Sequence, residues 1–294
     1  MSKLLHCDLE PLLEMLLSLL LLMPALGLRA APGSARRVTA LRASAEPGRE
    51  ITPPPDELRN QYFAVRHGQS TANLENIISS DPLVGSTSHE LTQLGKEQAS
   101  EAGASLWAML EEDGTPLEQV ALYSSNFTRA RETKEVVAFE LQRAWARANG
   151  GALGGVAGGG GVESPMVRIG LLSGLRERNF GALDGVNTGA YDDVWPRDLA
   201  DPWHEHNGVE SVASVCARLR AMVDTLEARH DGEAVVLCAH ADVIQIFQCW
   251  MACDANVCEF SSYRYKNGEV RRCDPVGECL PEPAPMVSQR GTAA

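Results

Sequence analysis

From position 60 onward, the chain alternates between short apolar runs and long segments of helical periodicity. The apolar runs predict four buried strands, at 61–66, 119–125, 167–172 and 233–240. The periodic segments predict four long helices, at 91–113, 127–148, 209–230 and 243–253. Strands that alternate with helices of this length build a mostly parallel sheet covered on both faces. The expected fold class is therefore α/β, a three-layer α/β/α sandwich.

Two local patterns add detail to this expectation. Thr92 precedes the first long helix and is a plausible N-cap, because its hydroxyl can accept from a free N–H of the first turn. The apolar residues of that helix that support one face are Leu94, Ala99, Leu106 and Leu110. The segment 260–273, with Asn267-Gly268 near its middle, predicts a hairpin that closes the domain.

Basic side chains follow the ends of three predicted strands. Arg66 and His67 end the first strand, Arg129 follows the second within a few residues, and His240 ends the last. In open parallel sheets ligands bind beyond the carboxyl ends of the strands. We therefore expect these four side chains to converge on one site.

Ordered motifs over residues 61–275 carry a family resemblance. They are VRHGQSTAN, LTQLGKEQA, YSSNFTRARETKE, LRERNFGALDG, GVES and VVLCAHADVIQI. This arrangement resembles the histidine phosphatase superfamily, also called the phosphoglycerate mutase-like family. The LRERNFG segment, with the later YDDVW, is also similar to uncharacterised plant and algal members. The resemblance implies the phosphoglycerate mutase-like fold.

The chemistry of phosphoryl transfer assigns roles to five residues. An imidazole can attack phosphorus, and His67 is the candidate nucleophile from the residues and from the resemblance. Arg66 and Arg129 offer planar donors that grip phosphate oxygens. The resemblance places the second histidine at His240, which adds a third cation if protonated. It also matches Glu177 to the general acid, which requires a raised pKa.

Further residues are candidates for substrate binding. Gly68 would let the backbone pass close to a phosphate, and Asn73 can donate an amide hydrogen to it. Arg178 either contacts the substrate beyond the phosphate or pairs with an acid. Ala241 stands where many relatives have glycine. Its methyl group leaves less room for a phosphate to approach the backbone closely. Asp242, two residues past His240, is a less favoured alternative to Glu177 as the general acid.

These residues predict a metal-independent phosphatase that hydrolyses phosphate monoesters through a phosphohistidine. The alternatives are a phosphoglycerate mutase, which shares every catalytic residue, and a non-catalytic phospho-ligand or protein-binding module on the same fold. Mutases carry extra basic residues after the acid, whereas this chain has one arginine, Arg197, and no lysine between Val186 and Glu210. That difference favours hydrolysis. The expected substrate is a phosphorylated small molecule whose identity the sequence leaves open.

The net charge of −13 disfavours nucleic acid as a partner, because an acidic surface repels phosphate except at a local basic pocket. No cofactor is expected. No metal is expected either, since the late cysteines, at 249, 253, 258, 273 and 279, match no common zinc spacing. Core packing is the favoured role of Cys249 and Cys253, with a structural zinc site or disulfides as alternatives.

The first fifty-five residues predict targeting rather than folding. Residues 15–28 are almost wholly apolar and resemble the core of a signal peptide, and 29–49 are rich in Arg, Ala and Ser, as transit peptides are. This order suits delivery to a plastid bounded by extra membranes, so plastid localisation is expected. The secretory pathway or a signal anchor is the alternative. No stable membrane span is expected in the mature form.

The remaining chain divides into one domain and a tail. We predict a histidine phosphatase domain over 56–280 and a flexible tail over 281–294. A glycine-rich tract at 149–163 predicts a surface insertion, because it lacks the Lys-Ser/Thr and the strand-helix frame of a nucleotide-binding loop.

Overall fold

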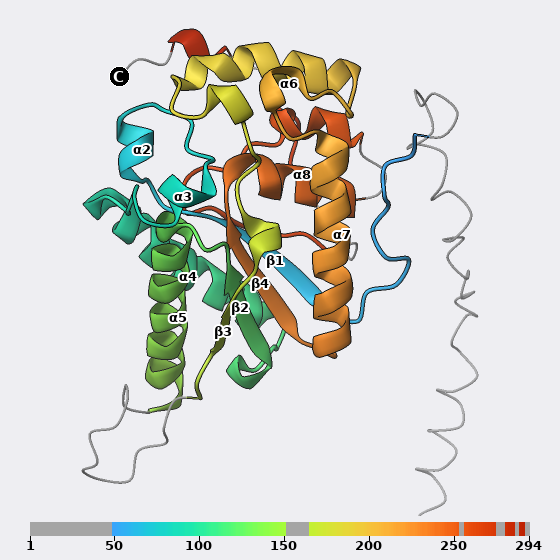
Figure 1. Cartoon of the computed structure of the whole chain (residues 1–294). Helices are drawn as coiled ribbons and strands as arrows, with labels where there is room; N and C mark the ends of the chain where they lie inside the picture. Colours follow the sequence, from blue (N-terminus) through green and yellow to red (C-terminus); the bar gives the residue numbers. More distant parts are fainter. Residues whose placement is uncertain (1–48, 151–164, 253–255, 275–279, 286–287, 292–294) are drawn as a thin grey trace, which may run out of the picture. The chain divides into compact units, whose positions relative to one another are not determined.

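The computed structural model describes residues 49–150, 165–252, 256–274, 280–285 and 288–291 (Figure 1). The strands in these ranges are β1 (Gln61–Arg66), β2 (Val120–Ser124), β3 (Arg168–Leu171), β4 (Ala234–Ala239) and β5 (Val270–Arg272). The α-helices are α2 (Thr71–Leu74), α3 (Pro82–Gly85), α4 (Gln93–Glu112), α5 (Thr128–Asn149), α6 (Tyr191–Ala200), α7 (Val212–Arg229) and α8 (Ala241–Met251). Every predicted strand and long helix is present, with bounds that differ by a few residues.

The strands pair in the order β3-β2-β4-β1-β5. Strand β4 lies between β1 and β2 and runs parallel to both, and β3 runs parallel to β2. The Cα partners are Arg66 with Ala239 and Ser124 with Cys238, so β1, β2 and β4 end at the same edge of the sheet. The mostly parallel sheet is confirmed, and its carboxyl edge is where the predicted site should lie.

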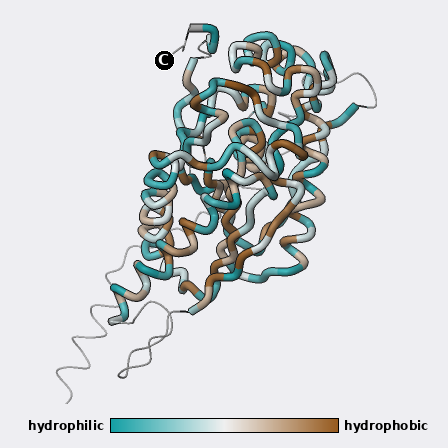
Figure 2. The backbone as a smooth tube through the Cα atoms, turned by 60° about the vertical axis from the view of Figure 1, so that its left-hand side comes forward, coloured by the Kyte–Doolittle hydropathy of each residue, from teal (hydrophilic) through white to brown (hydrophobic). Residues whose placement is uncertain are grey.

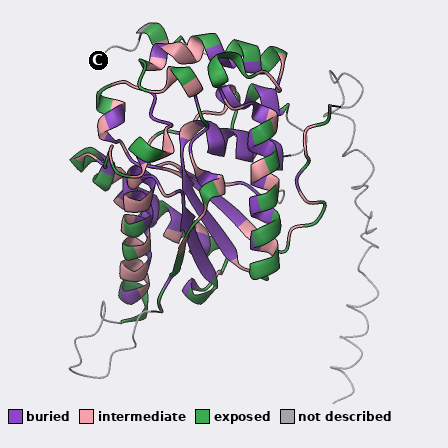
Figure 3. Ribbon diagram, viewed as in Figure 1, coloured by how far each residue is buried: buried purple, intermediate pink, exposed green. Residues whose placement is uncertain are grey.

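Alternate residues along the strands pack into two separate cores. Tyr62 and Ala64 of β1 contact the core that α7 and α8 build, whereas Phe63 and Val65 contact the core of α4 and α5. Figure 1 shows α4 and α5 on one face of the sheet and α7 on the other. The hydrophobic strands run through the middle (Figure 2), and the central strands β1, β2 and β4 are buried together with α8 (Figure 3). The three-layer α/β/α sandwich is confirmed.

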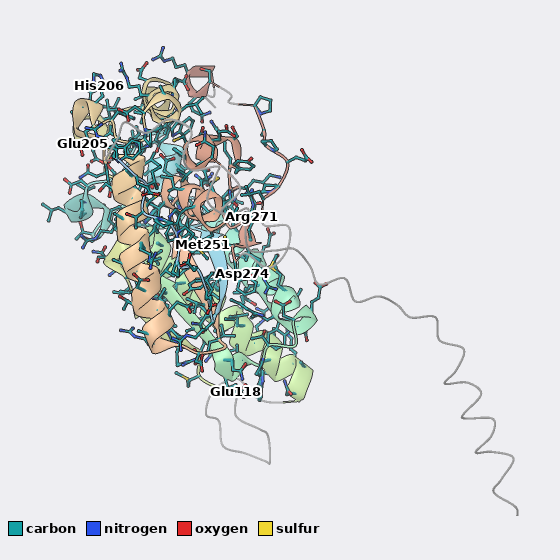
Figure 4. All side chains as sticks on the ribbon, turned by 90° about the vertical axis from the view of Figure 1, so that its right-hand side faces the viewer. Glu118, Glu205, His206, Met251, Arg271 and Asp274 are labelled. Carbon is teal, nitrogen blue, oxygen red and sulfur yellow. The ribbon has the colours of Figure 1, made fainter. Side chains whose placement is uncertain are left out.

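The two ends of the sheet lie at opposite ends of the domain in Figure 4. Glu118 precedes β2 and marks the amino edge, whereas Glu205 and His206, between α6 and α7, lie at the other end. Figure 1 shows α6 beyond the carboxyl ends of the strands. The carboxyl edge is therefore overlaid by α6 and its adjoining loops.

Helix α4 begins as predicted but buries a narrower face. The hydroxyl of Thr92 accepts a hydrogen bond from the Gly95 N–H, which confirms the N-cap. Leu106 and Leu110 are buried in the core, and Ala99 is buried too. Leu94 was expected on this face, but it is 48% exposed because it lies in the first turn, beyond the edge of the core.

The predicted hairpin at 260–273 is wrong. Residues Val257–Ser262 form a 3-10 helix, and β5 pairs antiparallel with β1 instead of with its own segment. The turn itself is present, since Gly268 has a φ of +76° and its N–H donates to the carbonyl of Arg66. Strand β5 pairs with β1 because the backbone N–H and C=O groups at the outer edge of β1 would otherwise lack hydrogen-bond partners.

Helix α6 was not predicted, and it contacts the C-terminal segment. Its first turn carries Asp192 and Asp193. The N–H of Gln289 donates to Asp192 at 2.9 Å, and the guanidinium of Arg290 pairs with Asp193 at 2.7 Å. The described end of the tail predicted at 281–294 is therefore packed on α6.

The N-terminal boundary lies earlier than the predicted position 56. Ile51 packs against the core of α7 and α8, and the indole N–H of Trp250 donates to the carbonyl of Thr52 at 2.6 Å. The fold of the domain thus includes residues within the segment predicted for targeting. The signal-like 15–28 and the glycine tract at 151–163 lie outside the described residues, as does the transit-like segment up to position 48.

The described cysteines are buried, and they are Cys216, Cys238, Cys249, Cys258 and Cys273. Cys216, Cys238, Cys249 and Cys258 are free thiols. Burial raises the pKa of the Cys258 thiol to about 11, which keeps it protonated at neutral pH. Core packing is confirmed for Cys249, while Cys253 and Cys279 lie outside the described residues. In the described ranges, no three potential ligand side chains gather as a metal site would require. None of the described helices combines the length and the apolar character of a membrane span.

We predict that a fragment of residues 49–294 is more stable than a fragment of residues 56–294. The shorter fragment loses the packing of Ile51 and leaves the buried indole N–H of Trp250 without its acceptor, at a cost of about 2 kcal/mol. Urea unfolding of both fragments measures the difference. Equal unfolding midpoints and slopes would show that residues 49–55 add nothing to the fold.

Candidate active site

His67 and Ser125 extend the hydrogen-bond ladders on either side of β4. The N–H of His67 donates to the carbonyl of Ala239 at 3.0 Å, and the N–H of Ser125 donates to that of Cys238 at 3.3 Å. His240 directly follows β4 and is the N-cap residue of α8. The ring centroids of His67 and His240 are 5.2 Å apart. The register of the sheet therefore brings the histidines together, as predicted.

Two hydrogen bonds fix the tautomer of His67. Its Nδ1 lies 2.7 Å from the carbonyl oxygen of Gly68, which can only accept, so Nδ1 carries the proton. The Nε of Arg129, which can only donate, lies 3.1 Å from Nε2. The lone pair of Nε2 therefore points toward Arg129, into the space where the basic side chains converge.

Arg129 is 3% exposed and is held in place by Ser79. One terminal nitrogen donates to the Ser79 hydroxyl at 3.2 Å and the other to the Ser79 carbonyl at 2.8 Å. Burial lowers the pKa of Arg129 to about 10, which leaves the guanidinium charged at neutral pH. No carboxylate among the described residues forms a salt bridge with Arg129.

Arg66 is the second cation of the site. One terminal nitrogen donates to the carbonyl of Tyr265 at 2.7 Å, and its Nε is buried without a hydrogen-bond partner. It too has no salt bridge among the described residues. Burial, then the charges of Arg129 and Arg66, lowers the pKa of His67 well below its usual value. His67 is therefore neutral at physiological pH.

His240 is buried beneath this cluster. The hydroxyl of Ser125 lies 2.7 Å from its Nε2, its Nδ1 is buried without a partner, and the ring of Phe127 packs against it at 4.9 Å. Burial and the nearby Arg129 lower the pKa of His240 well below its usual value. The lowered pKa disfavours the third cation that a protonated His240 would add, because burial and the nearby guanidinium both oppose a charge on the ring.

Glu177 is 8% exposed and lies in the field of both arginines. Its Oε1 accepts from the N–H of Arg178 at 2.8 Å. Burial, followed by the nearby Asp242, raises the pKa of Glu177 to about 7, although Arg129 and Arg66 oppose the shift. A carboxyl with that pKa can hold a proton near neutral pH, as a general acid must.

Asp242 raises the pKa of the Glu177 carboxyl but has partners of its own. It lies in the first turn of α8 and is 2% exposed. Its Oδ2 accepts from the indole of Trp195 at 3.3 Å and lies 3.5 Å from a terminal nitrogen of Arg178. Burial raises the pKa of Asp242, while the Arg178 charge opposes the shift. These partners make Asp242 the less available proton donor.

The geometry decides between the two roles that the sequence left open for Arg178. The side chain is fully buried, and its terminal nitrogens donate to both oxygens of Asp198 at 2.6 and 2.7 Å. Its Nε donates to the carbonyl of Glu210. Of the two predicted roles, pairing with an acid is correct and contact with a substrate is wrong, because the guanidinium of Arg178 donates to Asp198 and Glu210 inside the core. Arg178 supports the segment that carries the neighbouring acid.

Asn73 and Ala241 lie near the histidines in different ways. The side-chain oxygen of Asn73 accepts from the N–H of Ser70 at 2.9 Å, so its amide hydrogens are left for another acceptor. Asn267 donates to the carbonyl of His67 at 3.0 Å and lies 3.5 Å from Asn73. Ala241 is the first residue of α8, where backbone N–H groups have no acceptor within the helix. Phosphate contact by either residue stays a prediction.

Gly68 has a structural reason to be glycine. A Cβ at this position would lie 2.1 Å from the carbonyl oxygen of Gly95, and a Cβ at Gly95 would lie 2.0 Å from that of Gln69. The N–H of Gly68 donates to Thr133 at 3.1 Å. The loop after β1 therefore lies directly against the start of α4. The predicted close approach of Gly68 to phosphate is untested, and Gly95 was not predicted to matter.

The sequence profile of the histidine phosphatase superfamily (branch 1) matches residues 62–149 and 161–279. The chain belongs to the histidine phosphatase superfamily. No curated protein sequence matches the chain.

Solved structures share this superfamily fold. One is a mycobacterial hydrolase, with a TM-score of 0.51 and 21% identity, where the match covers 72% of this chain and 90% of that one. Another is a mycobacterial glucosyl-3-phosphoglycerate phosphatase, with a TM-score of 0.51 and 21% identity over 72% of this chain and 89% of that one. At this identity the likeness concerns the fold.

Two serines of this histidine phosphatase domain contact the site residues but were not predicted from the sequence. Ser79 accepts from both terminal nitrogens of Arg129, but it lies in a loop whose sequence has no distinctive pattern. Ser125 contacts His240, and the pair of serines that ends its strand was a visible signal.

We predict that Gly68→Ala and Gly95→Ala each destabilise the domain by several kcal/mol, because each new Cβ meets backbone that cannot move aside cheaply. Gly114→Ala is the control, since a Cβ there meets no atom within 4 Å and costs about 1 kcal/mol for its positive φ. Chemical denaturation measures all three. Equal losses in the three variants would refute the close approach.

Proposed function

We propose that this protein is a metal-independent phosphatase that hydrolyses phosphate monoesters through a phosphohistidine at His67. Membership of the histidine phosphatase superfamily supports phosphatase chemistry in general. The proposal about mechanism rests on the geometry around His67.

One observation carries the proposal. In a chain with a net charge of −13, Arg66 and Arg129 lie together at the strand ends with no carboxylate partner among the described residues. Burying two cations without a counter-ion is costly. A phosphate dianion would compensate both, and it would accept from the unused Nε of Arg66 and from Nδ1 of His240 if that atom carries the proton.

The first chemical step begins at Nε2 of His67. The Nδ1 proton is held by Gly68, so the Nε2 lone pair is available once a phosphate oxygen accepts the Arg129 N–H in its place. Nε2 attacks phosphorus as the ester P–O bond breaks. The two guanidiniums stabilise the charge on the transferring phosphoryl group.

Glu177 would serve both halves of the reaction. Its proton passes to the leaving oxygen in the first step, and the resulting carboxylate then removes a proton from water. That water attacks the phosphohistidine, the P–N bond breaks, and inorganic phosphate leaves with His67 neutral again. The raised pKa of Glu177 suits this exchange at neutral pH.

Phosphoglycerate mutase is the second candidate, since it would use the same residues. It differs in returning the phosphoryl group to an acceptor that remains bound. Arg197 is exposed on α6 and bonds the Asp193 carbonyl of its own helix, which does not favour a second phosphate-holding cluster there.

We predict that the full-length protein releases phosphate from p-nitrophenyl phosphate in EDTA, and that His67→Ala abolishes this release. Acid-quenched reactions with labelled substrate should show protein-bound phosphate in the wild type and none in His67→Ala. Arg147→Gln, an exposed residue at the end of α5, is the matched surface control.

Three outcomes separate the candidates. Hydrolysis that depends on His67, without isomerisation of 3-phosphoglycerate in the presence of 2,3-bisphosphoglycerate, supports the phosphatase. Isomerisation would make the protein a mutase. A folded protein that binds phosphate esters without turnover would identify a binding module.

The pKa values predict the direction of the pH dependence. The reactive form has His67 neutral and Glu177 protonated, so kcat/KM should fall as pH rises through about 7. With an alkyl phosphate, Glu177→Gln should lose about 10²–10⁴ in rate and lose this alkaline limb. With p-nitrophenyl phosphate, whose leaving group needs little protonation, the loss should be smaller. Equal losses with both substrates would exclude proton donation by Glu177.

A further inference from the structure

A groove of about 710 Å³ begins at Glu177. It runs between the 3-10 turn Ser173–Leu175 and α7, which contact each other beside the sheet (Figure 1). Glu177 belongs both to this groove and to the arginine cluster, because its carboxyl lies in the field of Arg66 and Arg129. The volume far exceeds that of a phosphate group and is of the size that holds a small organic ligand.

The two arginines that line the groove differ in their partners. Arg218 is neutralised by Glu210, with its Nε 2.8 Å and a terminal nitrogen 3.1 Å from the carboxylate oxygens, and its other terminal nitrogen donates to the Gly174 carbonyl. Arg176 donates only through Nε, to the side chain of Asn126 at 2.8 Å. Within the described ranges no carboxylate pairs with Arg176, so its two terminal nitrogens are free to bind an anion.

The position of Arg176 is fixed relative to the acid. It directly precedes Glu177 and caps the turn Ser173–Leu175, with its backbone N–H bonded to the Ser173 carbonyl. The amide of Asn126 holds the guanidinium from the β2–α5 loop. Arg176 and Glu177 both line the groove, so a leaving group held there would lie beside the guanidinium.

We propose that the groove binds the leaving group of the substrate and that Arg176 selects leaving groups carrying a second anion, a carboxylate or a phosphate, near the ester oxygen. This inference rests on the proposed phosphatase function. A planar guanidinium with two free nitrogens binds either anion with two hydrogen bonds. Leu172, Ala221 and Met222 line the groove as well, so it also offers apolar contact for a carbon skeleton.

The test compares three esters that share one aromatic skeleton. Phenyl phosphate has no second anion, 3-carboxyphenyl phosphate has a carboxylate, and resorcinol bisphosphate has a phosphate. The quantity measured is the ratio of kcat/KM for each anionic ester to kcat/KM for phenyl phosphate. The full-length protein is compared with Arg176→Gln, with Arg176→Lys, and with Arg147→Gln as a control for the lost surface charge.

The wild type should favour at least one anionic ester, and Arg176→Gln should lower that ratio by about 10- to 100-fold, as expected for a charge-assisted hydrogen bond. Arg176→Lys should keep part of the preference, and Arg147→Gln should keep all of it. The preferred ester distinguishes the carboxylate from the phosphate. A ratio near one in the wild type, or one that Arg176→Gln leaves unchanged, would overturn the inference.

The failure of this inference can be told apart from failure of the proposed function. Turnover of phenyl phosphate that disappears in His67→Ala tests the function and is independent of the ratio. If no ester is turned over, titration calorimetry with phenyl phosphate and 3-carboxyphenyl phosphate gives the same comparison as a ratio of Kd values. Loss of that ratio in Arg176→Gln would support the anion site even in a protein without phosphatase activity.

Discussion

The parallel pairing of β4 with both β1 and β2 is the constraint on which the site depends. It aligns three strand ends at one edge, so that His67, Ser125 and His240 emerge beside one another from segments far apart in the sequence. A slip of one residue would turn alternate side chains to the opposite face of the sheet. Alternate residues of β1 pack into two different cores, and this packing stabilises the register.

Burial and electrostatics explain why the histidines are neutral and why Glu177 can hold a proton near neutral pH. Burial, followed by the charge of the nearby guanidiniums, lowers the pKa of both histidines, and burial followed by the nearby Asp242 raises that of Glu177. These shifts favour the protonation states that the proposed attack on phosphorus requires. The cations destabilise the fold locally, and a bound dianion would offset that cost. Functional sites commonly contain groups that cost the fold stability in this way.

Sequence patterns predicted the sheet and the long helices well, and they failed where partners come from distant segments. The 260–273 segment has the turn of a hairpin, but the free edge of β1 offered β5 a better partner. Arg178 directly follows Glu177 in the motif, yet its guanidinium forms a buried salt bridge with Asp198. Neither outcome can be inferred from the local residues, because both depend on which groups tertiary packing leaves unsatisfied.

By itself, the sequence determined the order of the four main strands and the four long helices, the α/β class and the chemical identity of the residues at the strand ends, because periodicity and side-chain chemistry are local properties. Only the tertiary structure decided their environment. The tautomer of His67, the lack of a salt bridge to Arg66 or Arg129 among the described residues, and the groove beside Arg176 depend on which atoms meet across the fold. Burial and charge act through space, and for that reason they set the chemistry of the site.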